Sequence, residues 1–555
     1  MHYIRPFETL SKNDVPIVGG KNASLGEMIS TLKSQGIRVP DGFATTAEAY
    51  WAFLEHNHLK EKIAEEKDGK TIREWFLQAE FPPALAQEIT AAYKKLGKNA
   101  DVAVRSSATA EDLPDASFAG QQETFLHVRG PGALLDACRK CYASLFKDRA
   151  IAYRAAKNFE PMKVALSIGV QKMVRSDKGS SGVIFTLDPD SGFPRTVVIN
   201  AAWGLGENVV QGSINPDEYV VFKPTLSIIG KKLGKKEQKL IYHNSETKNV
   251  NTPRKQQASF ALSDADIIQL AKWSIIIENH YGRPMDIEWA KDGITDELYL
   301  VQARPETVHS LKHRGEYKNY VLKEKGKPLL HGLAIGDMIA AGKVQVIASP
   351  EHIEEFQPGS ILVTRVTSPD WVPIMKKAAG IITDLGGRTS HAAIVSRELG
   401  VPAIVGTATA THLLKTDQEI TLCCSEGEQG TIYEGKLRFE AAEISLEALP
   451  TPSVPLMLNI SSPEEAFRFW RLPCSGIGLA RMEFIINNII QIHPMALVHF
   501  DQVKDKKERR LIEKLTKGYT DRKDYFVQLL GLGIARIAAA RYPDPVIVRM
   551  SDFKT

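Results

Sequence analysis

One histidine of the chain stands where a phosphoryl group would be well held. His391 lies in the segment G-G-R-T-S-H-A-A-I-V-S-R-E-L-G, residues 386–400, in which glycines give way to an apolar helical pattern. Ser390 is a good cap residue, so we expect the helix to begin at His391 itself and to close at Gly400. A helix start favours anions, and a neutral imidazole is a competent nucleophile. The segment predicts a phosphorylated histidine, and the alternative is a surface histidine beside an ordinary cap.

Two segments in the first 121 residues contain basic side chains that could bind phosphate. Lys21 follows two glycines in G-G-K-N-A-S-L-G-E, and we expect it to precede a helix and to meet a phosphate. Residues 102–108 predict a short buried strand that delivers Arg105, and the small-residue segment 117–121 could approach phosphate oxygens closely. The alternatives are a surface lysine near a turn and an arginine in a structural ion pair.

A predicted hairpin brings together a candidate metal pair. Residues 285–289 and 298–304 both alternate in polarity, with a turn centred near Thr295 between them. That register sets Glu288 directly opposite Gln302 on one face. A carboxylate and an amide oxygen suit Mg²⁺ that keeps several waters and bridges nucleotide phosphates. Arg304 would face the same way, and the alternative is an exposed polar face without a ligand.

Composition narrows the class of protein. The 555 residues contain 70 basic and 66 acidic side chains, a net charge of +4. The basic clusters 231–239 and 504–510 lack interleaved aromatic residues, so we interpret them as solvated faces and expect no nucleic-acid partner. No signal-peptide pattern and no uncharged apolar run of about 18 residues appears, which predicts a cytoplasmic protein without a membrane span. Cys138 and Cys141 form a lone C-x-x-C pair, which we interpret as structural.

The chain predicts a multidomain protein of α+β and α/β classes. Residues 1–308 mix helices and short strands in an α+β domain of two lobes, and residues 309–328 have a linker composition. A compact block of short strands around the His391 helix occupies residues 329–448. A second linker, residues 449–455, leads to a β/α repeat in residues 456–555.

Taken in order, these segments resemble the phosphoenolpyruvate synthase (pyruvate, water dikinase) family over essentially the whole chain. The segments that carry the resemblance are G-G-K-N-A-S-L-G-E (19–27), V-R-S-S-A-T-A-E-D-L-P-D-A-S-F-A-G-Q (104–121), S-G-V-I-F-T-L-D-P (181–189), G-L-G-E (204–207), D-I-E-W (286–289), Q-A-R-P-E-T (302–307), G-G-R-T-S-H-A-A (386–393), G-I-G-L-A-R-M-E-F (476–484) and V-R-M-S-D-F-K (548–554). The resemblance implies an ATP-grasp-like nucleotide-binding domain, a swivelling phosphohistidine domain and a (β/α) barrel for pyruvate and phosphoenolpyruvate. Arg388 in the histidine motif resembles the synthase more than the phosphate-using dikinase.

The resemblance also implies a role for each candidate residue. His391 matches the phosphorylated histidine. The residues implied at the nucleotide and its Mg²⁺ are Lys21, Arg105, Glu288, Gln302 and Arg304, with Glu288 and Gln302 contacting the metal. Arg481 and Arg549 match two arginines that hold the phosphoryl and carboxylate oxygens of the substrate, a task suited to their rigid fork of donors.

The implied reaction is stepwise. ATP pyrophosphorylates His391, water removes the outer phosphate, the histidine domain swings to the barrel, and pyruvate enolate takes the remaining phosphoryl group. Only about three of eight β/α units fall within the chain, so we expect a barrel truncated at its C-terminal side and a chain competent for the ATP half-reaction only.

Three alternatives to that expectation stay open from the sequence. The first is a truncated pseudoenzyme or a phosphohistidine carrier subunit, and the second is a related antibiotic phosphotransferase. The third is an assembly, either a homo-oligomer or a complex with a complementing chain that supplies the C-terminal part of the barrel.

Overall fold

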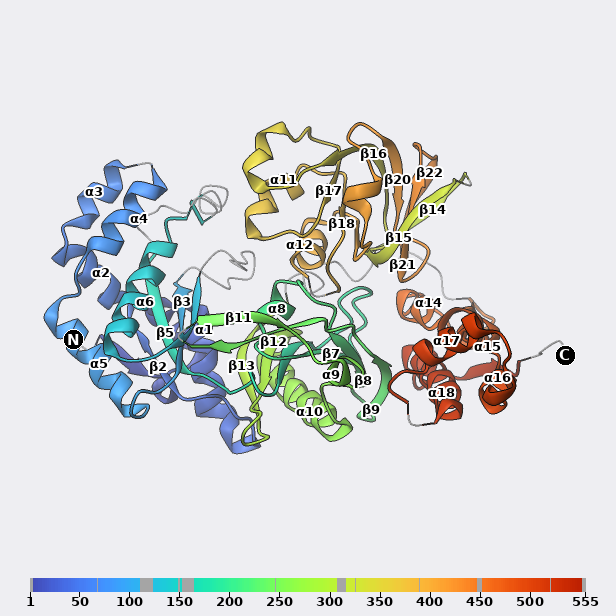
Figure 1. Ribbon diagram of the computed structural model, residues 1–555, viewed down its shortest axis with the longest axis horizontal. Coiled ribbons are helices and arrows are strands. Elements are labelled where there is room, and N and C mark those ends of the chain that lie inside the picture. The colour runs from blue at the N-terminus through green and yellow to red at the C-terminus, as the bar shows by residue number, and fades with distance from the viewer. Residues whose placement is uncertain are drawn as a thin grey trace.

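The protein consists of three parts that follow one another along the chain (Figure 1). The computed structural model describes residues 3–66, 68–109, 123–147, 150–151, 164–244, 246–306, 316–324, 326–388, 390–446, 452–519 and 521–551. An N-terminal domain of two lobes reaches residue 306, a histidine domain covers residues 316–446, and a C-terminal unit covers residues 452–551. Among the described helices, none is both long and apolar enough to cross a membrane. The predicted loop 117–121 lies outside the described residues.

The first lobe is a five-stranded sheet covered by helices. Its order is β1-β2-β5-β3-β4. The strands are β1 (Ile4–Pro6), β2 (Gly42–Thr45), β3 (Val102–Ala108), β4 (Thr124–Val128) and β5 (Leu166–Lys172), and the helices are α1 (Val15–Glu27), α2 (Ala47–His56), α3 (Leu59–Glu65), α4 (Gly69–Gln78), α5 (Pro83–Lys95) and α6 (Pro131–Ser144). Aromatic rings from three helices pack together in the core: Phe76 stacks on Tyr50 and Phe53, and Tyr142 meets Tyr50 edge-on. Cys138 and Cys141 are buried on α6, in agreement with a structural role.

The second lobe is an antiparallel six-stranded sheet backed by a long helix. Its order is β13-β12-β6-β7-β8-β9. The strands are β6 (Ser180–Phe185), β7 (Thr196–Trp203), β8 (Asp217–Phe222), β9 (Ser227–Lys232), β12 (Met285–Lys291) and β13 (Leu298–Pro305), with the separate hairpin β10 (Gln238–His243) and β11 (Glu246–Asn251) and the helices α8 (Glu207–Val210), α9 (Arg254–Gln257) and α10 (Asp264–Tyr281). Ser263 and Asp266 form a capping box at the start of α10, and Trp273 and Ile277 of this helix are buried. The two sheets confirm the expected α+β domain of two lobes.

The histidine domain is built around a closed barrel of seven strands. The barrel strands are β15 (Pro328–Ile335), β16 (Ile339–Val346), β17 (Ile361–Thr364), β18 (Gly380–Thr383), β19 (Ala403–Val405), β20 (Glu419–Cys423) and β21 (Gln429–Glu434), and the helices are α11 (Val372–Met375), α12 (His391–Leu399) and α13 (Ala410–Leu413). β14 (Glu316–Leu322) pairs with β22 (Phe439–Ser445) in a separate ribbon. Part of the segment predicted as a linker is therefore a strand, because its antiparallel partner lies more than 100 residues away and leaves no local signal.

The C-terminal unit is a parallel β/α arrangement. Its sheet contains β23 (Leu458–Ile460), β24 (Ile477–Arg481) and β25 (Val546–Arg549), and its helices are α14 (Pro463–Arg468), α15 (Met482–Ile485), α16 (Pro494–Val498), α17 (Lys506–Leu515) and α18 (Arg522–Arg541). Phe467 and Ile537 share one buried core with Phe193 and Phe222 of the second lobe. The unit therefore packs on the N-terminal domain through an apolar interface.

One basic cluster departs from its predicted exposure. Lys236, in the segment 231–239, is fully buried and pairs with the fully buried Asp217. Asp217 also accepts hydrogen bonds from the backbone N–H groups of Gly234 and Ala261, each at 2.8 Å. The prediction of a solvated face is therefore wrong for Lys236, which has a carboxylate partner inside the protein.

Candidate active site

One face of the β12–β13 hairpin gathers the candidate nucleotide and metal residues. Glu288 is paired with Gln302 in the register of the two strands, as predicted. Arg105, on β3 of the other lobe, donates to Gln302 Oε1 at 3.3 Å and lies 3.5 Å from Glu288 Oε2. The hairpin face therefore meets the strand that carries Arg105, and the lobes converge at these three side chains.

Arg304 occupies the same face, two residues beyond Gln302. Its Nε and Nη2 donate to Asp286 Oδ2 at 2.9 and 2.7 Å, and Asp286 is the register partner of Arg304. Asp286 is thus an acidic member of this face that the sequence analysis did not single out. The alternation that pointed to Glu288 could have found it, because Asp286 is two residues earlier on the same strand.

Lys21 reaches the same region from α1. Helical structure already begins at Val15, six residues before the lysine. Gly19 breaks that helix with φ 75°, and a Cβ there would come within 2.3 Å of Ser107 Oγ, so only glycine fits the close approach. Lys21 therefore sits at the start of a second helical segment, with Nζ 3.5 Å from the carbonyl oxygen of Ser106. The lysine therefore lies beside Ser106, the residue that follows Arg105 on β3.

His391 begins α12, as the sequence predicted. Ser390 is the N-cap, and its side chain accepts from the N–H of Ala393, while Gly400 ends the helix in the left-handed conformation. Nδ1 of His391 lies 2.9 Å from the hydroxyl oxygen of Thr367. No local pattern could have indicated Thr367, which is 24 residues earlier in the chain.

The start of α12 lies against the N-terminal domain. A Cβ added to Gly212, two residues past the end of α8, would meet Ser390 Cβ at 2.1 Å. Gly212 also has φ 66°, which side chains rarely adopt. Figure 1 shows α12 directly above α8, which belongs to the same lobe as the β12–β13 hairpin. The histidine is therefore presented to the lobe that carries the candidate nucleotide face.

The donor set at the hairpin fits a hard divalent cation. Glu288 and Gln302 supply one carboxylate and one amide oxygen side by side, and Mg²⁺ binds through few protein oxygens, waters and phosphates. Within the described residues there is no group of three His, Cys, Asp or Glu side chains that could hold a metal without such help. Arg105 donates to the Gln302 oxygen and forms an ion pair with Glu288, so a cation and Arg105 would compete for these oxygens unless a phosphate drew the guanidinium away.

The two candidate arginines of the C-terminal unit are direct neighbours. Arg481 at the end of β24 is the register partner of Arg549 at the end of β25. Arg549 Nη2 donates to Glu483 Oε1 at 2.6 Å, and this bond helps to lower the pKa of Glu483, second to a backbone hydrogen bond. Parallel strands carry both side chains to the same edge of the sheet, where (β/α) folds place their ligands.

Comparison with known proteins decides the family. Residues 15–324 match the pyruvate phosphate dikinase AMP/ATP-binding domain, and residues 356–427 match the mobile domain of PEP-utilising enzymes. The phosphoenolpyruvate synthase of Helicobacter pylori is 51% identical over all of this chain and 73% of its own length. Those of Pseudomonas aeruginosa and Aquifex aeolicus are 50% and 49% identical, over 100% and 98% of this chain and 73% of their own lengths. The chain belongs to the phosphoenolpyruvate synthase family.

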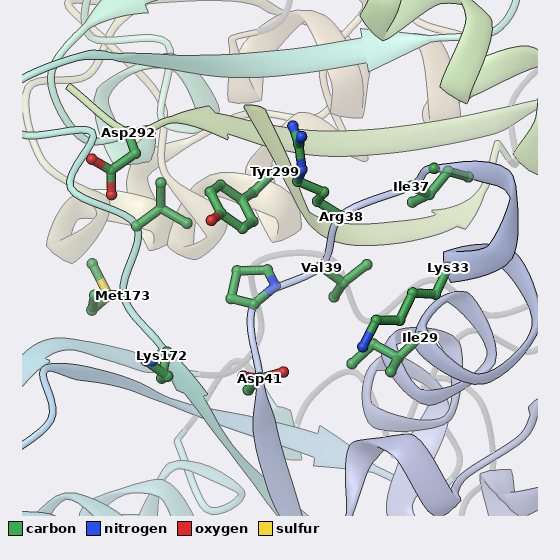
Figure 2. A pocket seen from close by; sticks show the side chains of 13 residues that line it. Ile29, Lys33, Ile37, Arg38, Val39, Asp41, Lys172, Met173, Asp292 and Tyr299 are labelled. Carbon is green, nitrogen blue, oxygen red and sulfur yellow. The ribbon is translucent and has the colours of Figure 1, made fainter. Parts of the chain in front are cut away.

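A cavity of about 520 Å³ lies away from these residues, at the opposite end of the β12–β13 hairpin. Figure 2 shows Arg38, Lys172, Asp292 and Tyr299 around it. None of the candidate site residues of this phosphoenolpyruvate synthase family member lines the cavity. Its charges are mixed, and Arg38 already pairs with Glu297 at 3.6 Å. The cavity therefore contributes no residue to the candidate site.

Proposed function

We propose that the protein converts ATP, pyruvate and water to AMP, phosphoenolpyruvate and phosphate through a phosphohistidine at His391. The observation that carries the proposal is the seating of the α12 start, with His391, against the lobe that holds the Glu288–Gln302 face. The relatives named phosphoenolpyruvate synthase support the choice of substrates. The order of the domains favours this reaction over an antibiotic phosphotransferase, because the mobile domain precedes the β/α unit.

The nucleotide side of the reaction would use the converged lobes. Lys21, Arg105 and Arg304 would neutralise phosphate oxygens, with Arg105 leaving Glu288 and Gln302 as it turns to the nucleotide. Glu288 and Gln302 would hold Mg²⁺, which when bound withdraws charge from the phosphate oxygens. Arginine forks suit this task because they bond two phosphate oxygens at once.

His391 would accept the phosphoryl groups in the first step. We assign the Nδ1 proton to the contact with Thr367, which makes Nε2 the nitrogen that attacks the β-phosphorus of ATP. The bond from the β-phosphorus to the bridging oxygen breaks, and AMP leaves with that oxygen. Water then cleaves the outer phosphate from the histidine, and one phosphoryl group remains on Nε2.

The second half-reaction would take place at the C-terminal unit. Pyruvate loses a methyl proton, its enolate oxygen attacks the phosphoryl group, and Nε2 of His391 leaves. Arg481 and Arg549 would bind the carboxylate and phosphoryl oxygens between them. We propose that phosphoryl transfer to pyruvate is the slower of the two half-reactions, because Arg549 is 52% exposed and its charge acts largely in water.

Labelled ATP tests this function. ATP carrying ³²P at its β-phosphate should place an acid-labile, base-stable label on the protein, release AMP rather than ADP, and leave His391→Ala unlabelled. Discharge of the label by pyruvate would identify the acceptor. A protein that is labelled but not discharged by pyruvate fits the carrier alternative, and a label that persists in His391→Ala would refute the assignment.

A further inference from the structure

The histidine domain meets the N-terminal domain through a small cluster of buried charges beside His391. Asp190, in the segment between β6 and β7, reaches two arginines of the histidine domain, Arg388 and Arg397. We propose that these three residues form a docking clamp that positions His391 for phosphorylation. The proposal rests on the function proposed above, and it assigns positioning residues that do not touch the nucleotide.

The clamp holds the chain on both sides of the histidine. Arg388 Nη1 lies 2.6 Å from Asp190 Oδ2, and Arg397 Nη2 lies 2.6 Å from Asp190 Oδ1, so each oxygen of one carboxylate serves one arginine. Arg388 stands three residues before His391, and Arg397 six residues after it. Arg397 Nη1 also donates to the carbonyl oxygen of Arg388 at 2.6 Å, which ties the loop to the helix.

Because the two arginines are buried, these ion pairs favour one docking position of the histidine domain. Arg388 and Arg397 are only 7% and 9% exposed, and a charge so placed needs a partner. Burial would raise the pKa of Asp190, but the attraction of the two guanidinium groups outweighs it and lowers that pKa, so Asp190 is a carboxylate at neutral pH. Glu218, also of the N-terminal domain, lies 3.4 Å from Arg388 Nε. A shifted docking pose would break the ion pairs with Asp190 and Glu218.

The clamp can also be released. Arg388 Nη2 pairs with Glu428, which belongs to the histidine domain and would travel with it. Undocking therefore breaks the pairs with Asp190 and Glu218 but does not leave Arg388 without a carboxylate. Glu428 in turn lies 3.5 Å from Arg536 of the C-terminal unit, so the network reaches all three parts of the protein. This arrangement suits a contact that forms and breaks in each turnover.

Precise seating matters because the neighbouring backbones are close. The approach of Ser390 to Gly212 leaves no room for even a methyl group, and His391 is the next residue. A histidine that must attack a phosphorus atom in line loses rate steeply when it is displaced by about 1 Å. We therefore expect the clamp to govern the rate of phosphorylation and not the affinity for ATP.

The test compares these two quantities in the same variants. Asp190→Asn keeps the shape of the side chain but removes its charge, and Arg397→Gln removes one of the two cations. The rate of His391 labelling by saturating ATP with ³²P at the β-phosphate should fall at least tenfold in each. The dissociation constant for α,β-methylene-ATP, whose α–β link cannot break, should stay within twofold. Arg397→Lys, which keeps the charge, should recover part of the rate.

A matched control comes from the same domain. Arg438 forms an exposed ion pair with Glu324, and Arg438→Gln should label like the unsubstituted protein. Equal labelling of folded Asp190→Asn and Arg397→Gln would overturn the clamp, and so would a parallel loss of nucleotide affinity. Absence of label in the unsubstituted protein would instead overturn the proposed function, so the two failures are distinguishable.

Discussion

The hydroxyl oxygen of Thr367 lies 2.9 Å from Nδ1 of His391. Thr367 is buried, and it enters from the segment after β17, so its hydroxyl is held in place by a different part of the barrel from α12. A threonine hydroxyl can accept from Nδ1–H or donate to a bare Nδ1, and in either case the contact fixes the orientation of the ring. In the proposed reaction the hydroxyl accepts from Nδ1–H, which leaves Nε2 as the attacking nitrogen.

Replacement of Thr367 should reduce the phosphorylation rate without removing the acceptor. Thr367→Val keeps the shape but loses the hydrogen bond, and we expect labelling to slow by roughly fivefold, in line with about 1 kcal/mol for such a bond. Thr367→Ser should stay close to the unsubstituted rate. The measurement is the first-order rate of ³²P incorporation, and equal rates for the valine and serine variants would contradict the prediction.

Glu288 should be essential for Mg²⁺-dependent consumption of ATP. Glu288→Ala removes the carboxylate of the candidate metal pair, and we expect AMP formation to fall by about 100-fold or more, since such electrostatic groups typically contribute that much. Glu297→Gln is the control, because Glu297 lies just before β13 of the same hairpin and pairs with Arg38. AMP release is measured by chromatography at several Mg²⁺ concentrations, and unchanged release by Glu288→Ala would end the assignment.

Lys236 should matter for stability and not for catalysis. Burial lowers the pKa of Lys236 and raises that of Asp217, while their mutual attraction acts in the opposite direction on both. Lys236→Met leaves a buried carboxylate without its cation, which costs about 3–5 kcal/mol. Lys235→Met, at an exposed neighbouring position, should change the free energy of unfolding little. Chemical denaturation of the two variants measures this difference, and equal midpoints would show that the Lys236–Asp217 pair does not contribute to the free energy of unfolding.

Local patterns predicted much of the candidate site. Alternating polarity predicted the pairing of Glu288 with Gln302, which the structure confirms. The turn alone would pair Glu288 with Val301, and a β-bulge between Glu288 and Trp289 shifts the register by one residue. A cap residue and a closing glycine were enough to start α12 at His391. These features depend on residues close together in the chain, so the sequence contains their signal.

Features that depend on distant residues were not predictable in this way. Thr367 reaches His391 from the segment after β17, and Asp190 reaches Arg388 from another domain. Lys236 looks like its exposed neighbours until Asp217 is seen beside it. In each case tertiary contact decides the role of the side chain, and neither composition nor periodicity reports such a contact.

The pairing of Arg481 with Arg549 predicts how the C-terminal unit binds its anion. If both guanidinium groups bind one phosphoenolpyruvate molecule, Arg481→Gln and Arg549→Gln should each weaken binding by roughly 10- to 100-fold, since a charge-assisted hydrogen bond contributes about 1.5–3 kcal/mol. Because the two forks share a ligand, the double variant should lose less than the sum of the single losses. Titration calorimetry with phosphoenolpyruvate measures these affinities, and Lys506→Gln on α17 serves as the control. Strictly additive losses would show that the two arginines act on separate anions, and unchanged affinity in both single variants would remove them from the substrate site.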